Sequence, residues 1–416
     1  MPSARLNAGL AFPRNRAPDP GLAVETQVTV EAALQPLAGE SLRVDLLVSE
    51  GAQVAQGQPL MRLKTAPEIA LVAPMAARVA RIELQPGRRL GQLVLFHETG
   101  GDRHRFDIHD TDNNPARLRA LLHESGLWRS IRSRPFGRAP APGEVPAAIL
   151  VMGTDTRPGA PDPTLAIQGR EQDLARGLAA LKRLTDGPVF LAGLQAPAPT
   201  RCVETGSLHP QGLAGHVLHR HFPARIESPL WDLSAEDAAD IGSLLETGLL
   251  PQTRLVSITG AALRAPRLVR CQPGANLRAL TRTLVMPGPY ELISGSALDG
   301  RSALWLGPLD RQVTVLPRAL PPTRRHWFRA ALERAARHAP IIPTAALNQA
   351  LGGDLPAAAL VRALAAGDAE AFIDLGGLTL LEEDVALADY ATGSGNRLAL
   401  QLRALLDRIA TEEGLA

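Results

Sequence analysis

The sequence predicts a multidomain protein of mixed α+β and α/β class, with an N-terminal β domain, a central α/β domain and a C-terminal helical domain. Three observations lead there. The 416 residues exceed what one core usually organises. Short alternating strands occupy the first hundred residues, and strand and helix patterns alternate afterwards. We place the domains at residues 1–100 (β), 101–260 (α/β), 261–320 (β-rich) and 321–416 (helical).

The N-terminal domain has the pattern of a barrel-sandwich hybrid. Residues 40–64 contain two short alternating strands around Gly51 and Gly57, which suit tight turns. Residues 69–96 continue this pattern through an Ala–Pro pair. Carriers of biotin or lipoyl groups share such a domain, but Lys64 is not flanked as a carrier lysine would be. We therefore expect a structural β domain.

Residues 101–260 predict a mostly parallel sheet with helices. A helix is expected over 116–128, with Leu118, Leu121 and Leu122 on one face. Ser234 is suited to cap a further helix, because acidic residues follow in its first turn. The expected strands are 147–155, 188–194 and 253–260, and the other expected helix is 169–187.

The rest of the chain returns to short strands and then to helices. Strands are expected within 266–317, and residues 323–416 are expected to be helical. The last helix places Leu398, Leu402, Leu405 and Ile409 on one stripe. Residues 324–338 predict a basic amphipathic helix, which suits an acidic partner, a membrane surface or plain solvent exposure. Glu382, Glu383 and Asp384 are interpreted as a charged run at the start of the last region.

Composition excludes several classes of function. The formal net charge of +2 gives no basic excess, so nucleic acid is not an expected partner. Cys202 and Cys271 are too few for a disulfide framework or a four-cysteine iron–sulfur cluster. The first residues lack a signal peptide, and no stretch of 18 apolar residues predicts a membrane-spanning helix. We expect a cytoplasmic protein whose membrane contact is indirect.

No motif predicts a catalytic centre. The sequence lacks G-x-G-x-x-G and a Walker A lysine, so a standard nucleotide site is not expected. His209, His216, His219 and His221 lie close together in the sequence, and imidazole is a common metal ligand. His219 and His221 would share one face of a strand, whereas His216 and His219 have helical spacing. We favour hydrogen-bonding histidines over a metal site and keep open a pocket that they would line.

A second candidate site combines arginines with aromatic residues. The segment 126–140 contains Trp128, Arg129, Arg132, Arg134, Phe136 and Arg138. Arginine beside aromatic residues is typical of protein contact surfaces. The planar guanidinium also suits an anion or a quinone headgroup. A solvated basic loop is the alternative interpretation.

Taken in order, these strings resemble the A subunit of the Na⁺-translocating NADH:quinone reductase. The motif G-L-W-x-x-x-R-x-R-P-F matches Gly126 to Phe136 fully, and I-S-G-S-x-L-x-G-R matches Ile293 to Arg301. Shorter matches are Gly9–Leu10 with Pro13, Asp155 to Pro158, Gly206 to His219, Pro266 to Arg270 and Gln312 to Leu316. Both long motifs are specific enough to make chance a poor explanation.

The resemblance implies a peripheral protein of the inner face of the plasma membrane, where it docks on a membrane subunit. It also implies a central domain similar to the flavin-binding subunit of respiratory complex I. No cofactor would be bound covalently here, and flavins, iron–sulfur centres and the NADH site would belong to partner subunits. Ubiquinone is implied to bind on or near this chain. The chain would not be catalytic on its own.

Two departures from the family pattern leave an alternative open. The family's Cys–Pro–Gly turn is replaced by Ala391, Thr392 and Gly393, and the region 317–340 is altered. The alternative is a divergent paralogue that serves as a docking or assembly module of another bioenergetic membrane complex. A stand-alone metal- or nucleotide-dependent enzyme is the third hypothesis, which the missing motifs oppose.

Overall fold

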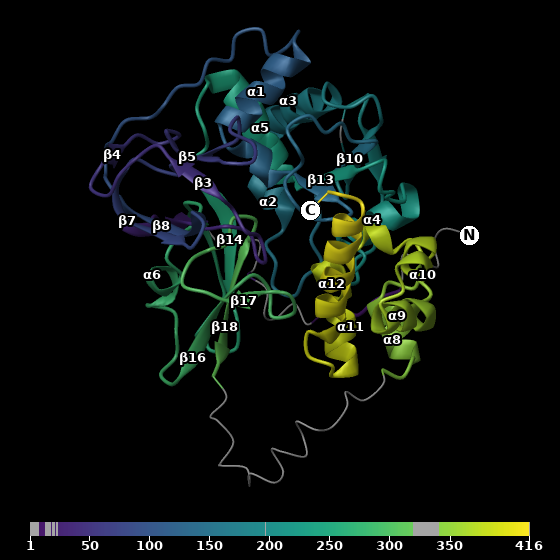
Figure 1. The fold of residues 1–416 in the computed structure, drawn as a ribbon. Coiled ribbons are helices and arrows are strands. Elements are labelled where there is room, and N and C mark those ends of the chain that lie inside the picture. The colour runs from purple at the N-terminus through teal and green to yellow at the C-terminus, as the bar shows by residue number, and fades with distance from the viewer. Residues whose placement is uncertain are drawn as a thin grey trace.

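The computed structural model describes residues 8–12, 18, 21, 24–195, 197–318 and 341–415. Within these ranges the strands form four sheets. The N-terminal strands lie at the upper left of Figure 1, with a six-stranded sheet below them, and the C-terminal helices lie at the right. The predicted basic helix at 324–338 lies outside the described residues. None of the described helices is both long and apolar enough to cross a membrane.

Two antiparallel sheets form the N-terminal domain, in the orders β2-β8-β7-β4 and β3-β5-β6. Both predicted turn glycines adopt positive φ, at 83° for Gly51 and 81° for Gly57, which is costly for other residues. The strands are β2 (Glu31–Leu34), β3 (Val44–Leu46), β4 (Gln53–Val54), β5 (Pro59–Leu63), β6 (Ala70–Val72), β7 (Ala77–Gln85) and β8 (Arg89–His97).

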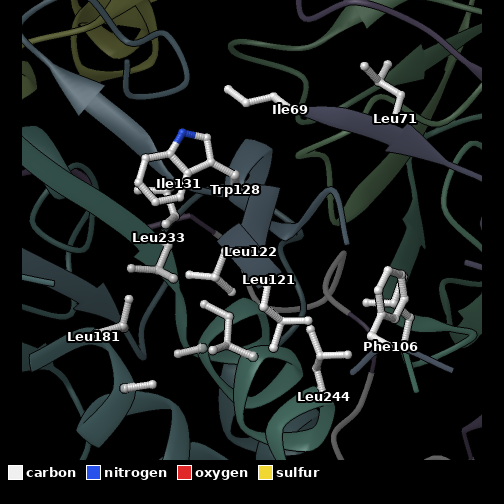
Figure 2. Close-up of a cluster of buried hydrophobic side chains, with 14 of the residues drawn as sticks. Ile69, Leu71, Phe106, Leu121, Leu122, Trp128, Ile131, Leu181, Leu233 and Leu244 are labelled. Atoms are coloured by element: carbon white, nitrogen blue, oxygen red, sulfur yellow. The ribbon is translucent and has the colours of Figure 1, made fainter. Parts of the chain in front are cut away.

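The core of this domain continues into the central domain. The predicted helix forms as α1 (Pro115–Glu124), followed by the 3₁₀ turn η3 (Leu127–Ser130). Leu118, Leu121 and Leu122 are fully buried, as their spacing predicts. Figure 2 shows Leu121 and Leu122 in one cluster with Ile69 and Leu71 of the N-terminal domain. The two domains therefore share one hydrophobic core.

The central sheet has the order β12-β11-β10-β13-β9. Its first four strands are parallel, and β9 pairs antiparallel with β13. The strands are β9 (Arg132–Arg134), β10 (Ala148–Met152), β11 (Val189–Ala192), β12 (Arg201–Val203) and β13 (Leu230–Ser234). The helices of this region are α2 (Pro163–Ile167), α3 (Glu171–Lys182), α4 (Ala214–His221) and α5 (Ala235–Thr247). The mostly parallel sheet predicted from the alternation is confirmed.

Strand β10 is buried on both faces, as parallel strands between helices usually are. Successive side chains point to opposite faces of the sheet. Ile149 and Val151 join the core shared with the N-terminal domain, whereas Leu150 and Met152 join the core of the C-terminal helices. The central sheet therefore separates two cores.

Helices α3 and α5 pack directly against each other, and glycine at two positions allows their backbones to come this close. A Cβ on Gly177 would lie 1.8 Å from the carbonyl oxygen of Ala238, and one on Gly242 would lie 1.9 Å from that of Asp173. The caps follow the sequence, since the Ser234 side chain accepts a hydrogen bond from the backbone N–H of Asp237. Helix α3 ends at Lys182, earlier than the predicted Gly187.

A six-stranded sheet, β1-β15-β14-β18-β16-β17, follows the central domain. Residues 253–260 form their predicted strand, but the prediction that it joins the central sheet is wrong, because it pairs with β15 and β18. A short connection lets β14 pair antiparallel with the next strand. The elements are β1 (Glu25–Thr26), β14 (Arg254–Thr259), β15 (Arg267–Cys271), α6 (Leu277–Thr281), β16 (Tyr290–Ser294), β17 (Arg301–Ser302) and β18 (Gln312–Pro317).

The described C-terminal residues are helical, as predicted. Leu398, Leu402, Leu405 and Ile409 of the last helix are all buried, which confirms the predicted stripe. They pack in the same core as Leu150 of the central sheet. The elements are α8 (Ala345–Ala350), α9 (Ala357–Ala366), α10 (Ala369–Asp374), η4 (Gly377–Thr379), α11 (Glu382–Thr392) and α12 (Arg397–Glu412).

Candidate functional site

Strand β9 presents two arginines of the candidate site on one face of the central sheet. Arg132 and Arg134 flank Ser133, and alternate residues of a strand share a face. Both meet Asp232 of the neighbouring strand β13. Arg132 Nη2 lies 2.7 Å from Asp232 Oδ2, and Arg134 Nε donates to Asp232 Oδ1 at 2.7 Å. One carboxylate therefore bridges the two guanidinium groups.

The start of α11 completes this cluster from the other side. Arg134 Nη1 donates to Asp384 Oδ2 at 2.9 Å and also to the carbonyl oxygen of Thr379. Arg132 Nη1 pairs with Glu383. Arg134 and Asp384 have no exposed side-chain surface. We call Arg132, Arg134, Asp232, Glu383 and Asp384 the β9 cluster.

The histidine segment reaches the same carboxylate. The backbone N–H of Gly215 donates to Asp384 Oδ1 at 3.2 Å, and His216 Nε2 lies 3.1 Å from the carbonyl oxygen of Asp384. A Cβ on Gly215 would lie 2.2 Å from the Asp384 carboxylate, so only glycine fits this contact. The structure therefore brings parts of both predicted segments together at Asp384.

Opposite charges set the protonation states in the β9 cluster. Burial would raise the pKa of Asp232, but the attraction of Arg132 and Arg134 outweighs it and lowers that pKa. Glu383 behaves alike: burial raises its pKa, and the same arginines bring it well below its usual range. Burial alone would lower the pKa of Arg134, but the attraction of Asp232 and Asp384 outweighs burial, so the pKa is raised. Asp232, Glu383 and Arg134 therefore stay charged near neutral pH.

Trp128 and Arg129 lie apart from this cluster. Trp128 is fully buried, and its indole N–H donates to the carbonyl oxygen of Pro140 at 2.8 Å. Its ring meets that of Trp231 edge to face, with centroids 5.1 Å apart, and Figure 2 shows it inside the core. Arg129 turns toward the N-terminal domain, where Nη2 donates to Glu40 Oε2 at 2.7 Å. These two residues join domains.

Phe136 and His219 are half-buried on the C-terminal side. Phe136 packs against the core of the C-terminal helices, and its carbonyl oxygen accepts from Arg403 at 2.9 Å. His219 lies beside Gly376, where a Cβ would come 2.6 Å from its ring. Burial lowers the pKa of His219, which keeps the imidazole neutral. The strand alternation expected for His219 and His221 is wrong, because both lie in helix α4.

His209 lies in a separate buried setting. Its Nδ1 lies 3.2 Å from the hydroxyl of Thr156, and its ring meets Phe12 with centroids 5.8 Å apart. Burial and then Arg157 lower the pKa of His209 to about 3, so it is neutral. Its Nε2 has no hydrogen-bond partner among the described residues. The described residues also contain no group of three His, Cys, Asp or Glu placed to hold a metal ion.

Sequence reasoning missed the carboxylates that complete the β9 cluster. Glu382, Glu383 and Asp384 form the charged run that the sequence indicates, but Asp384 is fully buried and the Glu383 side chain is 13% exposed. The backbone turns inward before α11, which carries these acids under β9. Asp232 gave a usable signal, because a lone carboxylate in the apolar strand Leu230–Ser234 needs a buried cation.

The paired charges indicate what the β9 cluster does. Its guanidinium groups bind carboxylates and the Thr379 carbonyl, and burial leaves Arg134 no solvent-exposed side-chain surface. Of their nitrogens, Arg134 Nη2 alone has no hydrogen-bond partner among the described residues, and it lies 3.7 Å from Glu383 Oε1. Such an arrangement fastens the C-terminal helices to the edge strand of the central sheet. It supplies neither a nucleophile nor an exposed general base.

The fold and this cluster define a multidomain α/β protein whose charged residues hold domains together. Family models match three stretches: the NqrA N-terminal barrel-sandwich hybrid domain (residues 4–98), the NqrA second alpha/beta domain (114–250) and the NQRA C-terminal domain (255–304). The barrel-sandwich hybrid predicted from the glycine pattern is thereby confirmed.

Similarity to whole proteins extends over nearly the full chain. The A subunit of the Na(+)-translocating NADH-quinone reductase of Teredinibacter turnerae is 32% identical over 409 residues, covering 89% of this chain and 91% of that protein. Its counterpart in Tolumonas auensis is 31% identical, covering 98% of this chain and 99% of that protein. The chain therefore belongs to the family of A subunits of the Na⁺-translocating NADH-quinone reductase.

Among solved structures, a NAD⁺-reducing NiFe hydrogenase in its H₂-reduced state is similar with a TM-score of 0.40 and 12% identity. The match covers 71% of this chain and 63% of that chain. A likeness this low carries no argument about function or about the predicted similarity to a flavin-binding subunit.

Proposed function

We propose that this chain is the A subunit of a Na⁺-translocating NADH:quinone oxidoreductase. It lies on the inner face of the plasma membrane, docks there on a membrane subunit of the complex and is not catalytic alone. The flavins, the iron–sulfur centres and the NADH site belong to partner subunits. The predicted similarity of the central domain to the flavin-binding subunit of complex I remains part of this proposal.

One observation carries the proposal. Identity of 31% extends over 98% of the chain and 99% of a named relative from this family, so no domain of that relative lacks a counterpart here. The internal charges also fit a scaffold. The arginines of the candidate site that lie on β9 bind carboxylates of the same chain.

The test is purification of the tagged full-length chain from gently solubilised native membranes, with every co-purifying subunit identified. Membranes from cells that express the tag alone are the control. We expect the membrane subunits of the Na⁺-translocating reductase to co-purify in fixed stoichiometry. Recovery of a different bioenergetic complex would instead support the divergent-paralogue hypothesis, for which the altered turn at 391–393 is the motivating feature.

We also propose that ubiquinone contacts this chain on the half-buried edge of the candidate site. Arg132, Phe136 and His219 keep part of their surface exposed. Trp128, Arg134, His209 and His216 are buried, and Arg129 is held by Glu40, so these residues would act by supporting the edge. A planar guanidinium such as that of Arg132 suits a quinone carbonyl.

A conservative variant tests the quinone contact and keeps the buried Arg134 in place. Arg132→Gln removes a cation whose side chain is 22% exposed, and it leaves Arg134 to neutralise Asp232 and to face Glu383 at 3.7 Å. We expect weaker binding of a short-chain ubiquinone in equilibrium dialysis with the purified chain. Arg201→Gln is the matched control, because Arg201 is an exposed arginine of β12, at the opposite edge of the central sheet from β9. Equal affinity of Arg132→Gln and the parent chain would remove Arg132 from the proposal.

A further inference from the structure

An outer face of the N-terminal domain gathers cations that lie outside the candidate site. Strands β3 and β5 of one sheet meet the start of β8 of the other sheet there, through the bridge between Arg43 and Arg89, at the left of Figure 1. Arg43 and Lys64 flank β3 and β5, and Arg88 and Arg89 lie at the turn into β8. All four side chains belong to exposed residues. We call these four residues the basic face.

Three of these cations stand side by side across neighbouring strands. Arg43 and Arg89 form an antiparallel bridge, so their side chains lie directly opposite on one face. Continuing the β3–β5 register by one residue places Lys64 opposite Arg43, and the Lys64 N–H donates to the Arg43 carbonyl oxygen at 2.9 Å. Like charges directly opposite destabilise a sheet. This arrangement therefore costs the isolated protein stability.

Arg88 adds a second unfavourable feature. Its φ of 59° lies in the left-handed region, which disfavours residues with a Cβ, and it follows Gly87 with φ 79°. Tight hairpin turns of this kind usually place Gly, Asn or Asp there. Strained residues of this sort concentrate at functional sites. A glycine at residue 88 would suit the backbone better, so the arginine side chain is the feature that needs a reason.

Few acids neutralise this face. Arg88 pairs with Asp45 at 3.6 Å, with both side chains about half exposed. Among the described residues, Arg43, Lys64 and Arg89 have no ion pair. The whole chain carries a net charge of only +2. The four cations of the basic face exceed that whole-chain value, so the rest of the chain carries a formal net charge of 2 − 4 = −2.

The neighbouring side chains indicate which anionic partner fits. Leu47 is 52% exposed beyond Asp45 on β3, and Leu84 is 38% exposed beside the hairpin turn. Arginine and lysine with exposed aliphatic side chains suit the headgroup region of a bilayer.

We propose that the basic face binds the headgroups of anionic phospholipids on a membrane surface. Phosphate oxygens would lie between Arg43, Lys64 and Arg89 and relieve their mutual repulsion. The proposal does not rest on the identity of the membrane partner on which the chain docks, since lipid contact is made by the chain itself.

Flotation of the purified full-length chain with lipid vesicles tests this. We expect binding to vesicles of phosphatidylglycerol mixed with phosphatidylcholine, little binding to phosphatidylcholine alone, and release as salt screens the charges. The triple variant Arg43→Gln, Lys64→Gln, Arg89→Gln should bind more weakly by about two orders of magnitude, at about fivefold for each cation. Its fold should persist, because like-charge repulsion is removed.

Two further variants separate charge from folding. Arg201→Gln, Arg225→Gln, Arg362→Gln has the same change in net charge at exposed residues of the central and C-terminal domains and should bind like the parent chain. Arg88→Gly should weaken vesicle binding while leaving the melting temperature equal or higher. Binding of the triple Gln variant at parental affinity would overturn the proposal. A second pair of results would also overturn it. In that case the parent chain binds neither type of vesicle, and an acidic protein that co-purifies with the parent chain does not co-purify with the triple variant.

Discussion

The central domain carries two buried sets of arginines and carboxylates, the β9 cluster and a second one at the start of α5. In the second set, Arg311 donates to Glu236 at 2.9 Å and to Asp237 at 2.7 Å, and Arg170 pairs with Asp240 at 2.7 Å. We call these five residues the α5 cluster. The β9 cluster holds the C-terminal helices on the central sheet. The α5 cluster links α3 and α5 to the six-stranded sheet through Arg311, and the backbone N–H of Leu255 also donates to Glu236.

The two clusters differ in how their acids are protonated. In the β9 cluster, Asp232 and Glu383 have lowered pKa values because arginines lie between acids from separate elements. In the α5 cluster, burial and then Glu236 raise the pKa of Asp240 to about 7. All three acids of that cluster lie near the start of one helix, so they repel each other. Both clusters contain two arginines and three acids, so the arrangement of the charges, rather than their number, sets the direction of the pKa shifts of Asp232, Glu383 and Asp240.

The largest expected effect is that of Arg134→Met. It leaves Asp232 and Asp384 buried without their shared cation, and breaking a buried pair from one side costs about 3–5 kcal/mol. Urea unfolding should shift to lower concentration, and hydrogen exchange should rise first in α11. The free energy of unfolding of Arg134→Lys should lie between those of the parent chain and Arg134→Met, because an ammonium group cannot bridge both acids in the same way. A decrease in the free energy of unfolding below about 1 kcal/mol would show that the β9 cluster does not hold the C-terminal helices in place.

A smaller effect of opposite sign is expected for Asp240→Asn. The folded-state pKa of Asp240 is raised from 3.8 to about 7, so the folded chain binds a proton that the unfolded chain lacks in that range. Its contribution to stability is therefore present below about pH 4 and is lost as pH rises to about 7. The amide of Asp240→Asn does not ionise, so this variant does not lose that stability as the pH rises. Relative to the parent chain, this variant should gain on the order of 2 kcal/mol between pH 5 and pH 8.

Asp232→Asn is the matched comparison for that experiment. The folded-state pKa of Asp232 is lowered, so its stabilising contribution is present above the unfolded-state pKa and is lost only as pH falls below it. Asp232→Asn should therefore be destabilised equally at pH 5 and pH 8, as measured by urea midpoints. Equal pH dependence of the two variants would erase the distinction between the clusters.

The smallest effect belongs to Arg138→Gln. Arg138 pairs with Asp407 at 3.3 Å, but both side chains are about half exposed. Water and salt screen such a pair, so removing it should change the free energy of unfolding by about 0–1 kcal/mol. The same urea titration measures this. A loss as large as that of Arg134→Met would mean that burial does not set the strength of these pairs.

Much of the fold could be predicted from the sequence, because helices, turns and caps depend on the types and spacing of a few neighbouring residues. The spacing of Leu398, Leu402, Leu405 and Ile409 predicted a buried helical face, and Gly51 and Gly57 predicted turns with positive φ. The cap at Ser234 was also predicted. Each of these features depends on neighbours within a turn or two of the chain, so composition and spacing suffice.

The candidate site was predicted only in part. The arginine and histidine segments were selected from their residue types, but their meeting at Asp384 was not, since Arg134 and Asp384 are 250 residues apart. Glu383 and Asp384 look like solvated acids in the sequence. The strand at 254–259 likewise gave no sign of the sheet that it joins. No local pattern encodes a partner that distant.

The periodic faces, the turns, the caps and the family of this protein follow from the printed sequence. Packing of distant elements is what places Arg132 and Arg134 against Asp232, buries Asp240, and aligns Arg43 with Arg89 on an outer sheet face. The physical reason is that a side chain's charge is local, whereas its burial and its neighbours depend on how distant strands and helices pack.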